Sequence, residues 1–135
     1  GGLGPSPVVT LLLAAGACAG ADVVSILEKM QVQLASCRIE LTGRRNADYP
    51  RRYNHIWMRF ILKGEGLTEA NTRRAVELSV TKYCSVLHPL DPAIPLETEI
   101  LIEGSPRCRC RSPMGCPLPF LLAVQPHQFV RGVTR

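Results

Sequence analysis

The stretch SPVVTLLLAAGACAGADVVSILEKM, residues 6–30, decides the fold. Its apolar residues recur at steps of three and four, which predicts a long helix with one face in the core. Ser6 is expected to cap the free backbone N–H groups, and Pro7 suits the first turn because its missing N–H costs nothing there. The neighbouring face, which includes Cys18 and Asp22, is almost free of charge, so we expect the first half of the helix to be buried nearly all round.

The apolar run Val8 to Ala21 imitates a secretory signal, because it ends in small residues. Two features argue against a signal: no Lys or Arg precedes the run, and the helical pattern continues through Asp22, Glu28 and Lys29. The run is also shorter than the roughly 20 apolar residues that cross a bilayer. We therefore expect a buried helix of a cytoplasmic protein that does not contact a membrane.

Downstream, two segments alternate apolar and polar residues, 37–42 and 56–62, and the polar turn 43–51 between them predicts a hairpin. Thr68 is a suitable cap for a second helix. The core-facing residues of that helix are expected to be Val76, Val80, Tyr83, Cys84 and Leu87. After three prolines, residues 98–102 alternate again and predict a last strand.

The order helix, strand, strand, helix, strand predicts an α+β fold, with two long core helices packed on an antiparallel sheet. We expect residues 1–103 to form one domain. Residues 104–135 differ in composition, with five of the eleven prolines and no acidic residue, and predict a Pro-, Arg- and Cys-rich tail of poorly specified structure.

The net charge of +5 comes from this tail, since residues 1–103 hold eleven basic and eleven acidic side chains. A nucleic-acid site needs Lys and Arg gathered on one face, with aromatic residues for stacking. The domain offers only Arg44-Arg45 and Arg51-Arg52 near a turn, which are typical of a solvated loop. We therefore expect no nucleic-acid partner.

Six cysteines, three of them in the tail, are too few and too unevenly placed for a secreted disulfide framework. The three in the domain, Cys18, Cys37 and Cys84, indicate free thiols in a reducing compartment. Cys37 lies on the inward face of its strand and is expected to be structural. Gly16 and Gly20 flank Cys18 and would leave room around its sulfur. The two helices could pack with the sulfurs of Cys18 and Cys84 adjacent, but buried inert cysteines have the same pattern.

Other candidate sites are weaker. A zinc site in the tail would use as ligands Cys108, Cys110, Cys116 and His127. The spacing of these cysteines is not that of a standard zinc-binding pair. His55 and His88 fit surface or strand-end positions better than catalytic ones. The sequence therefore predicts neither a metal nor a cofactor.

Five stretches in order resemble the OsmC/Ohr family of osmotically inducible and organic-hydroperoxide-resistance proteins. They are GPSP (4–7), LLLAAGACAGADVVSILEKM (11–30), LTGRRNADYPRRY (41–53), GLTEANTRRAVELSVTKYCSV (66–86) and LDPAIPLETEI (90–100). The resemblance covers residues 4–103 and is greatest to the OsmC-like branch of redox proteins whose substrate is uncertain.

The resemblance implies a thiol peroxidase that reduces organic hydroperoxides. Cys18 matches the peroxidatic position and Cys84 the resolving position. A thiolate on Cys18 would become a sulfenic acid, and Cys84 would capture it as a disulfide. The resemblance further implies an external dithiol reductant, a lipoyl group or a small thiol, and an intertwined homodimer with the site near the subunit interface.

The chain also departs from the family pattern. The peroxidase branch has a Glu that orders an activating Arg, and the matching positions here are Val8 and Val9. The N-terminal strands that supply this Arg are expected to be missing. Two alternatives to a peroxidase therefore stand beside it: a non-catalytic OsmC-like protein that binds a small apolar ligand or a partner, and a truncated, inactive product.

Overall fold

The computed structural model describes residues 4–103 and 120–123, with side chains only in the first range. The elements of this part of the chain are α1 (Pro7–Lys29), β1 (Gln33–Arg45), β2 (Tyr53–Glu65), α2 (Glu69–Leu78), the π-helical turn η1 (Ser79–Tyr83), β3 (Leu96–Glu103) and β4 (Phe120–Ala123). They confirm the α+β class. The tail residues considered above as zinc ligands, Cys108, Cys110, Cys116 and His127, lie outside the described residues.

The helix predicted from residues 6–30 is α1. Pro7 occupies the first turn as expected, but the Ser6 hydroxyl makes no capping hydrogen bond. The Ser6 carbonyl instead accepts the Thr10 N–H at 2.9 Å. The helix is not buried all round, because Leu11 is 40% exposed.

At 23 residues, α1 has the length and apolar composition of a segment that crosses a membrane, so the length argument against such a segment is wrong. Core helices and signal sequences share these properties. What places α1 in the core is its packing, since Ala15, Ala19, Val23 and Leu27 on one stripe are almost completely buried.

The sheet is mixed, not antiparallel. β1 and β2 form the predicted hairpin, which pairs Gln33 with Glu65 at one end and Arg45 with Tyr53 at the other. β3 runs parallel to β2, because α2 and the following turns carry the chain from the end of β2 back to its beginning, and a helical crossover of this kind places the next strand parallel. The short β4 pairs parallel with β1, which gives the order β3-β2-β1-β4.

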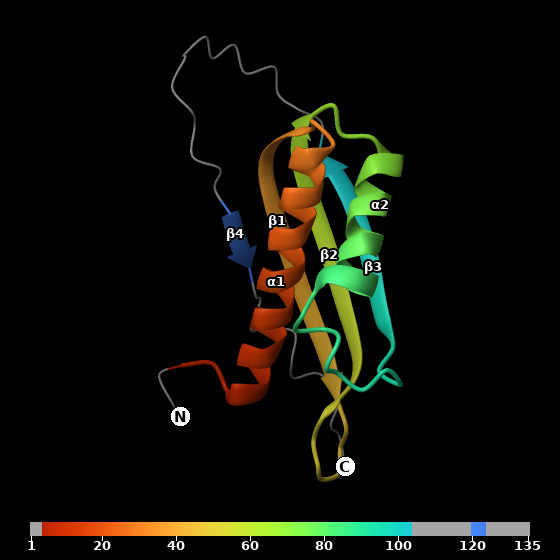
Figure 1. Cartoon of the computed structure of the whole chain (residues 1–135). Helices are drawn as coiled ribbons and strands as arrows, with labels where there is room; N and C mark the ends of the chain where they lie inside the picture. The colour runs from red at the N-terminus through yellow and green to blue at the C-terminus, as the bar shows by residue number, and fades with distance from the viewer. Residues whose placement is uncertain (1–3, 104–119, 124–135) are drawn as a thin grey trace.

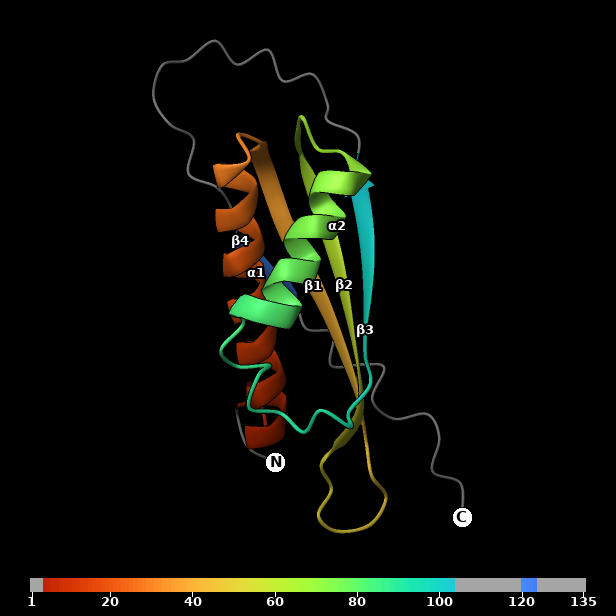
Figure 2. The ribbon, with the colours of Figure 1, turned by 45° about the vertical axis from the view of Figure 1, so that its right-hand side comes forward.

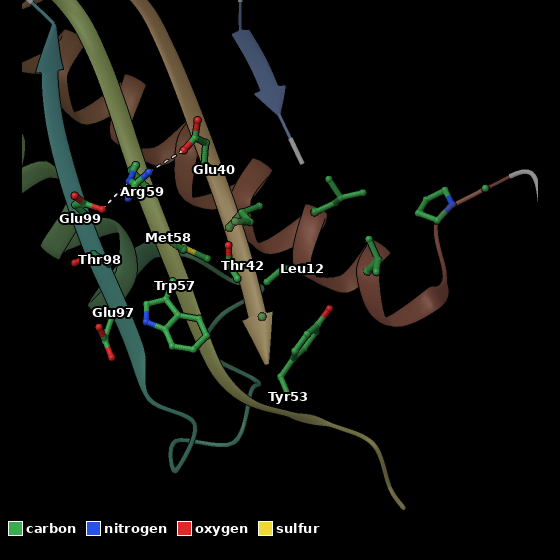
Figure 3. A pocket seen from close by; sticks show the side chains of 16 residues that line it. Leu12, Glu40, Thr42, Tyr53, Trp57, Met58, Arg59, Glu97, Thr98 and Glu99 are labelled. Atoms are coloured by element: carbon green, nitrogen blue, oxygen red, sulfur yellow. Dashed lines mark hydrogen bonds and ion pairs between the residues drawn. The ribbon is translucent and has the colours of Figure 1, made fainter. Parts of the chain in front are cut away.

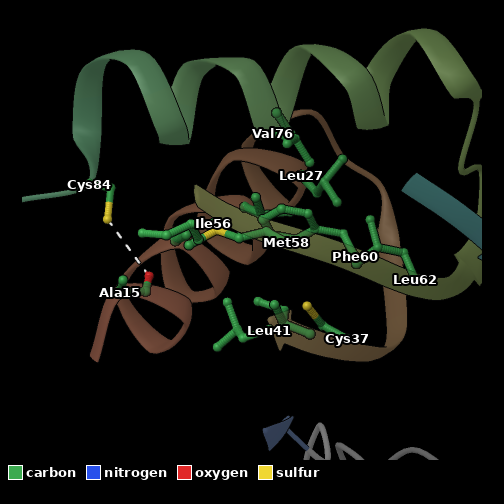
Figure 4. Close-up of a cluster of buried hydrophobic side chains, with 14 of the residues drawn as sticks. Ala15, Leu27, Cys37, Leu41, Ile56, Met58, Phe60, Leu62, Val76 and Cys84 are labelled. Carbon is green, nitrogen blue, oxygen red and sulfur yellow. Dashed lines mark hydrogen bonds between the residues drawn. The ribbon is translucent and has the colours of Figure 1, made fainter. Parts of the chain in front are cut away.

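Both helices cover the same face of the sheet (Figures 1 and 2). The inward positions predicted for the two hairpin strands are all buried: Cys37, Ile39, Leu41, Ile56, Met58, Phe60 and Leu62. They pack with the stripe of α1 and with Ala75 and Val76 of α2 in one core (Figure 4). The alternation of apolar and polar residues therefore identified the core face correctly.

α2 begins as predicted, with the Thr68 hydroxyl accepting the Asn71 N–H at 3.2 Å. Its last turn widens into η1, where the Cys84 N–H donates to the Ser79 carbonyl five residues earlier, at 2.8 Å. The extra residue in this turn changes which side chains face α1. Ser79 is fully buried, whereas Tyr83, expected in the core, is 49% exposed.

Gly16 does not open space around the Cys18 sulfur. It is buried against β1, where a Cβ atom would lie 2.3 Å from Leu41 Cδ1 and 3.2 Å from Leu41 Cγ. This glycine therefore allows the α1 backbone to approach the sheet closely.

We expect Gly16→Ala to lower the free energy of unfolding by about 1–3 kcal/mol, because Leu41 must shift in a filled core. An alanine without this contact would instead stabilise the helix by roughly 0.5–1 kcal/mol. Urea unfolding of Gly16→Ala, with Leu41→Val and the double variant, tests the contact: the shorter valine should recover part of the loss. A gain in stability from Gly16→Ala alone would contradict the contact.

Candidate active site

Cys18 and Cys84 meet between the two helices. Cys18 lies in the middle of α1, on the side that faces η1, and Cys84 is the first residue after η1. Cys84 has extended backbone dihedral angles, φ −69° and ψ 100°, and its carbonyl accepts the His88 N–H at 3.2 Å. The end of a helix and the turn after it therefore hold this cysteine in place.

The thiol sulfurs of Cys18 and Cys84 and a carboxylate oxygen of Asp22 all lie within 4.8 Å of one another. Both cysteines are free thiols. Cys84 is completely buried, and its sulfur lies 3.9 Å from the Ala15 carbonyl oxygen on α1 (Figure 4). Cys18 is partly exposed. The two sulfurs are thus close but unequal in their access to solvent.

Burial raises the pKa of the Cys84 thiol, and a hydrogen bond with Cys18 raises it further. Hydrogen bonds from the backbone N–H groups of Leu87 and Val86 oppose this shift. Burial is the largest cause because a charged thiolate loses its hydration in an apolar interior. Cys84 therefore remains a protonated thiol, with one S–H proton and two acceptors in reach, the Ala15 carbonyl and the Cys18 sulfur.

Asp22 and Ser79 complete the cluster, and neither was predicted from the sequence to belong to a site. The Ser79 Oγ lies 3.1 Å from the Ala19 carbonyl oxygen, to which it donates, and 3.4 Å from Asp22 Oδ2. Asp22 was predictable, because it follows Cys18 by four residues and therefore shares its helix face. Ser79 was not, because its inward position depends on the π-helical turn.

A groove of about 280 Å³ runs along the surface beside Asp22, where the end of α1 meets α2 and η1. Its wall is mainly apolar, with Ile26, Met30, Leu78 and Tyr83, and Lys29 lies at its edge. The groove reaches the cluster through Asp22.

Cys37 lies apart from the pair, on β1 and within the core. It is 3% exposed, and burial raises the pKa of its thiol to about 11. The expectation that Cys37 is structural agrees with this environment, since a neutral buried thiol is a poor nucleophile at neutral pH.

The histidines considered as bases do not join the cluster. His55 lies on the face of the sheet away from the helices, stacked on Trp57 with ring centroids 3.9 Å apart and 2.6 Å from a Glu97 oxygen. His88 is exposed, and its contact with Cys84 is made by its backbone N–H.

A larger cavity of about 1290 Å³ lies along the first turns of α1 and over the three long strands (Figure 3). Its apolar wall includes Leu12, Trp57 and Met58. On its polar side Arg59 bridges two strands, 3.3 Å from Glu40 and 2.6 Å from Glu99. Of the cysteines that the structure describes, Cys18, Cys37 and Cys84, none lines this cavity.

The arrangement of two helices on one face of a mixed sheet has counterparts among known proteins. The family profile described as OsmC-like protein matches residues 1–99, which include both cysteines. The chain belongs to the OsmC-like family. The resemblance noted in the sequence is therefore confirmed.

Among OsmC-like relatives, Protein YhfA of Escherichia coli K12 is 44% identical over 90 residues, which is 67% of each sequence. A hypothetical protein from Aquifex aeolicus VF5 is 33% identical, with a TM-score of 0.73 over 77% of this chain and 78% of that one. The organic hydroperoxide resistance protein OhrB of Bacillus subtilis is 12% identical, with a TM-score of 0.53 over 76% and 73%. OhrB shares the fold alone, and the names of the first two relatives specify no activity.

The Glu of the peroxidase branch has no replacement in this OsmC-like chain at the matching positions. Val8 and Val9 are partly buried apolar residues, and the Val8 carbonyl accepts the Tyr53 hydroxyl at 3.0 Å. In the part of the chain that the structure describes, no Lys or Arg side chain forms a hydrogen bond with either sulfur of the pair.

The Cys37 thiol should make the fold sensitive to alkali. The folded protein keeps this thiol neutral up to about pH 11, whereas the unfolded chain ionises it near the ordinary pKa of 9.0. The stabilisation is therefore complete below pH 9 and is lost as the pH rises towards 11. Urea unfolding of wild type and Cys37→Ala should show a stability difference that shrinks across this range. A constant difference would contradict the assignment.

Proposed function

We propose that this OsmC-like protein is a thiol peroxidase, which reduces organic hydroperoxides with Cys18 as the peroxidatic and Cys84 as the resolving cysteine. One observation carries the proposal: the two free sulfurs lie within 4.8 Å of each other, and only one of them is buried from solvent. Two cysteines that only fill the core would not require adjacent sulfurs, and their side chains would not need to differ in solvent exposure.

The difference in exposure supports the assignment of roles. A peroxide can approach Cys18, which is partly exposed, but not Cys84, which is completely buried. Burial also raises the pKa of Cys84, and a protonated thiol does not attack a peroxide. The Cys84 S–H is instead placed to donate to the Cys18 sulfur. Once Cys18 is oxidised, the Cys84 proton passes to the leaving hydroxyl while the Cys84 sulfur attacks the Cys18 sulfur.

The reaction balances in three steps. The Cys18 thiolate attacks one peroxide oxygen, the O–O bond breaks, and the products are Cys18–SOH and an alkoxide that takes up a proton to become the alcohol. The Cys84 sulfur then attacks Cys18–SOH, which forms the disulfide and releases water. An external dithiol, such as a dihydrolipoyl group or a small thiol, reduces the disulfide by thiol exchange and is itself oxidised.

The second step requires a small movement. A disulfide brings its sulfurs to about 2.05 Å. The sulfurs start within 4.8 Å, so side-chain rotation and a shift of the turn after η1 are sufficient. The shift leaves the hydrogen bonds of α2 intact, but it strains the bond from the Cys84 N–H to the Ser79 carbonyl and the bond from the His88 N–H to the Cys84 carbonyl.

The apolar wall of the groove beside Asp22 favours peroxides with an apolar organic group over hydrogen peroxide. The dithiol reductant places the cycle in a reducing compartment, and we infer the cytoplasm. These inferences follow from the proposed chemistry.

We further infer that the protein acts as a homodimer. The large cavity along the first turns of α1 exposes apolar side chains, including part of Trp57, next to the ion pairs of Arg59 (Figure 3). An apolar surface with a polar rim is typical of subunit interfaces.

The peroxidase is tested by treating the fully reduced protein with cumene hydroperoxide and mapping disulfides by mass spectrometry. We expect a Cys18–Cys84 disulfide and loss of one peroxide per chain. Cys18→Ser should abolish consumption. Cys84→Ser should still consume peroxide once and should accumulate a sulfenic acid that dimedone traps, since the proposed resolving thiol has been removed.

Cys37→Ser is the matched control, because it removes a buried thiol far from the pair, and it should change neither result. The proposal fails if Cys18→Ser consumes peroxide as fast as wild type, or if the disulfide forms through Cys108, Cys110 or Cys116. The non-catalytic alternative predicts that no cysteine of the domain oxidises.

The dimer is tested by sedimentation equilibrium, which should give twice the 14.8 kDa of the chain. Trp57 lies outside the core, so Trp57→Ala should weaken association without unfolding the chain. A monomeric wild type at high concentration would contradict the homodimer.

A further inference from the structure

We propose that Cys18, Asp22 and Cys84 form a binding site for a zinc ion, and that zinc and the disulfide exclude each other at this site. The first half of this proposal is independent of the peroxidase, whereas the exclusion rests on the proposed function. Three observations support the zinc site. The donor atoms lie close together, Asp22 has no cationic partner among the described residues, and the Ser79 hydroxyl contacts the Asp22 carboxylate.

The donor atoms are already close to the geometry that zinc requires. Two sulfurs bound to one zinc ion at about 2.3 Å, in tetrahedral geometry, lie roughly 3.8 Å apart. Here the two sulfurs and the carboxylate oxygen lie within 4.8 Å of one another, so the two sulfurs need to approach by about 1 Å at most and the oxygen slightly more. Rotation of the side chains can provide this.

The backbone also favours chelation. Cys18 and Asp22 are four residues apart on α1, and side chains at this spacing share one helix face and can bind the same ion. Cys84 approaches from η1, so the third donor comes from another element and joins the two helices. A site of three protein ligands leaves one position of the tetrahedron for water or another ligand.

Asp22 is a half-buried carboxylate without a cation. Among the described residues, no Lys, Arg or His forms an ion pair with it. Its only side-chain hydrogen-bond partner there is Ser79, at 3.4 Å. A negative charge that is partly removed from water is costly unless a positive group is present. A cation between Asp22 and the two sulfurs would compensate for this cost.

Ser79 acts as a positioning residue. Its buried hydroxyl donates its one proton mainly to the Ala19 carbonyl at 3.1 Å and shares it weakly with Asp22 Oδ2 at 3.4 Å, so it restricts the positions that the carboxylate can occupy. Metal sites regularly use such outer hydrogen bonds to orient their ligands.

The donors select the metal. Thiolates prefer soft or borderline ions, whereas Mg²⁺ and Ca²⁺ prefer oxygen donors only. Zn²⁺ binds sulfur and carboxylate oxygen together. Binding involves no change of oxidation state: Zn²⁺ displaces the two thiol protons, two Zn–S bonds form, and two protons enter the solvent. A zinc-bound sulfur has its electron pair engaged and cannot join the other sulfur.

The zinc site is tested by titrating the reduced full-length protein with Zn²⁺ against a chromophoric chelator, and with Co²⁺, whose thiolate charge-transfer absorption reports Co–S bonds. We expect one ion per chain, with release of two protons. Cys18→Ser removes one of the two sulfur ligands, so the thiolate absorption should fall to half or disappear. Asp22→Asn keeps both thiols but removes the charged oxygen, and should weaken binding more than about ten-fold.

The tail requires its own control. The variant in which Cys108, Cys110 and Cys116 are all Ser should still bind one ion. The proposal is overturned if this variant loses the ion, or if Asp22→Asn binds as tightly as wild type. Cys37→Ser should bind normally. Circular dichroism checks that each variant is folded. If Cys84→Ser does not fold, Asp22→Asn still tests the site, because Asp22 lies outside the core.

The exclusion is tested separately by adding hydroperoxide to the zinc-loaded protein. We expect slower formation of the Cys18–Cys84 disulfide than in the metal-free protein, and release of one Zn²⁺ for each disulfide formed. If zinc binds and no disulfide forms in either state, the peroxidase fails and the zinc site stands. If the disulfide forms at the same rate with zinc bound, the exclusion fails.

Discussion

The contact between the middle of α1 and η1 is the interaction on which the rest of the structure depends. Two side chains from the second helical segment reach backbone carbonyls of the first: the Ser79 hydroxyl donates to Ala19, and the Cys84 thiol lies near the carbonyl of Ala15. Only small side chains on α1 leave these carbonyls accessible, so a run of alanine and glycine is needed where a longer residue would separate the helices. The same approach brings Cys84 to Cys18. The proximity of the sulfurs is therefore a consequence of how the helices pack.

Much of this arrangement could be predicted from the sequence. Period alone identified α1, both hairpin strands and the core-facing stripe of each. Pro7 in the first turn of α1 and the Thr68 cap of α2 followed from local chemistry, whereas the predicted Ser6 cap forms no hydrogen bond. The position of Ser79 could not be predicted. In a regular α-helix, the core-facing side that begins at Val76 continues to Val80 and Tyr83. The structure instead places Val76, Ser79 and Cys84 inward. The wider π-helical turn between them depends on contacts with α1. Single π-helical turns are typical of functional sites, where the extra residue changes the direction in which one side chain points.

Two other differences have the same origin in long-range packing. The parallel β3 follows from the route of the crossover, which returns Leu96 to the side of Ile56, and no local pattern encodes that route. Gly16 looked like a residue that opens space for a thiol, because the sequence shows it only beside Cys18. In the fold it faces Leu41 of the sheet and allows α1 to lie close to it. A small residue next to a candidate nucleophile therefore says little until its own neighbours are known.

Asp22 gives the site its particular character. A carboxylate close to two sulfurs has the same charge as a thiolate, so it does not help Cys18 to react as the Arg and Glu of the peroxidase branch would. The same charge favours a cation held between the three groups. Asp22 would therefore favour the proposed metal-bound state of the sulfur pair over the proposed oxidised state. The buried hydroxyl of Ser79 lies 3.4 Å from this carboxylate and is itself held by the Ala19 carbonyl, so the packing of the two helices also sets where Asp22 lies.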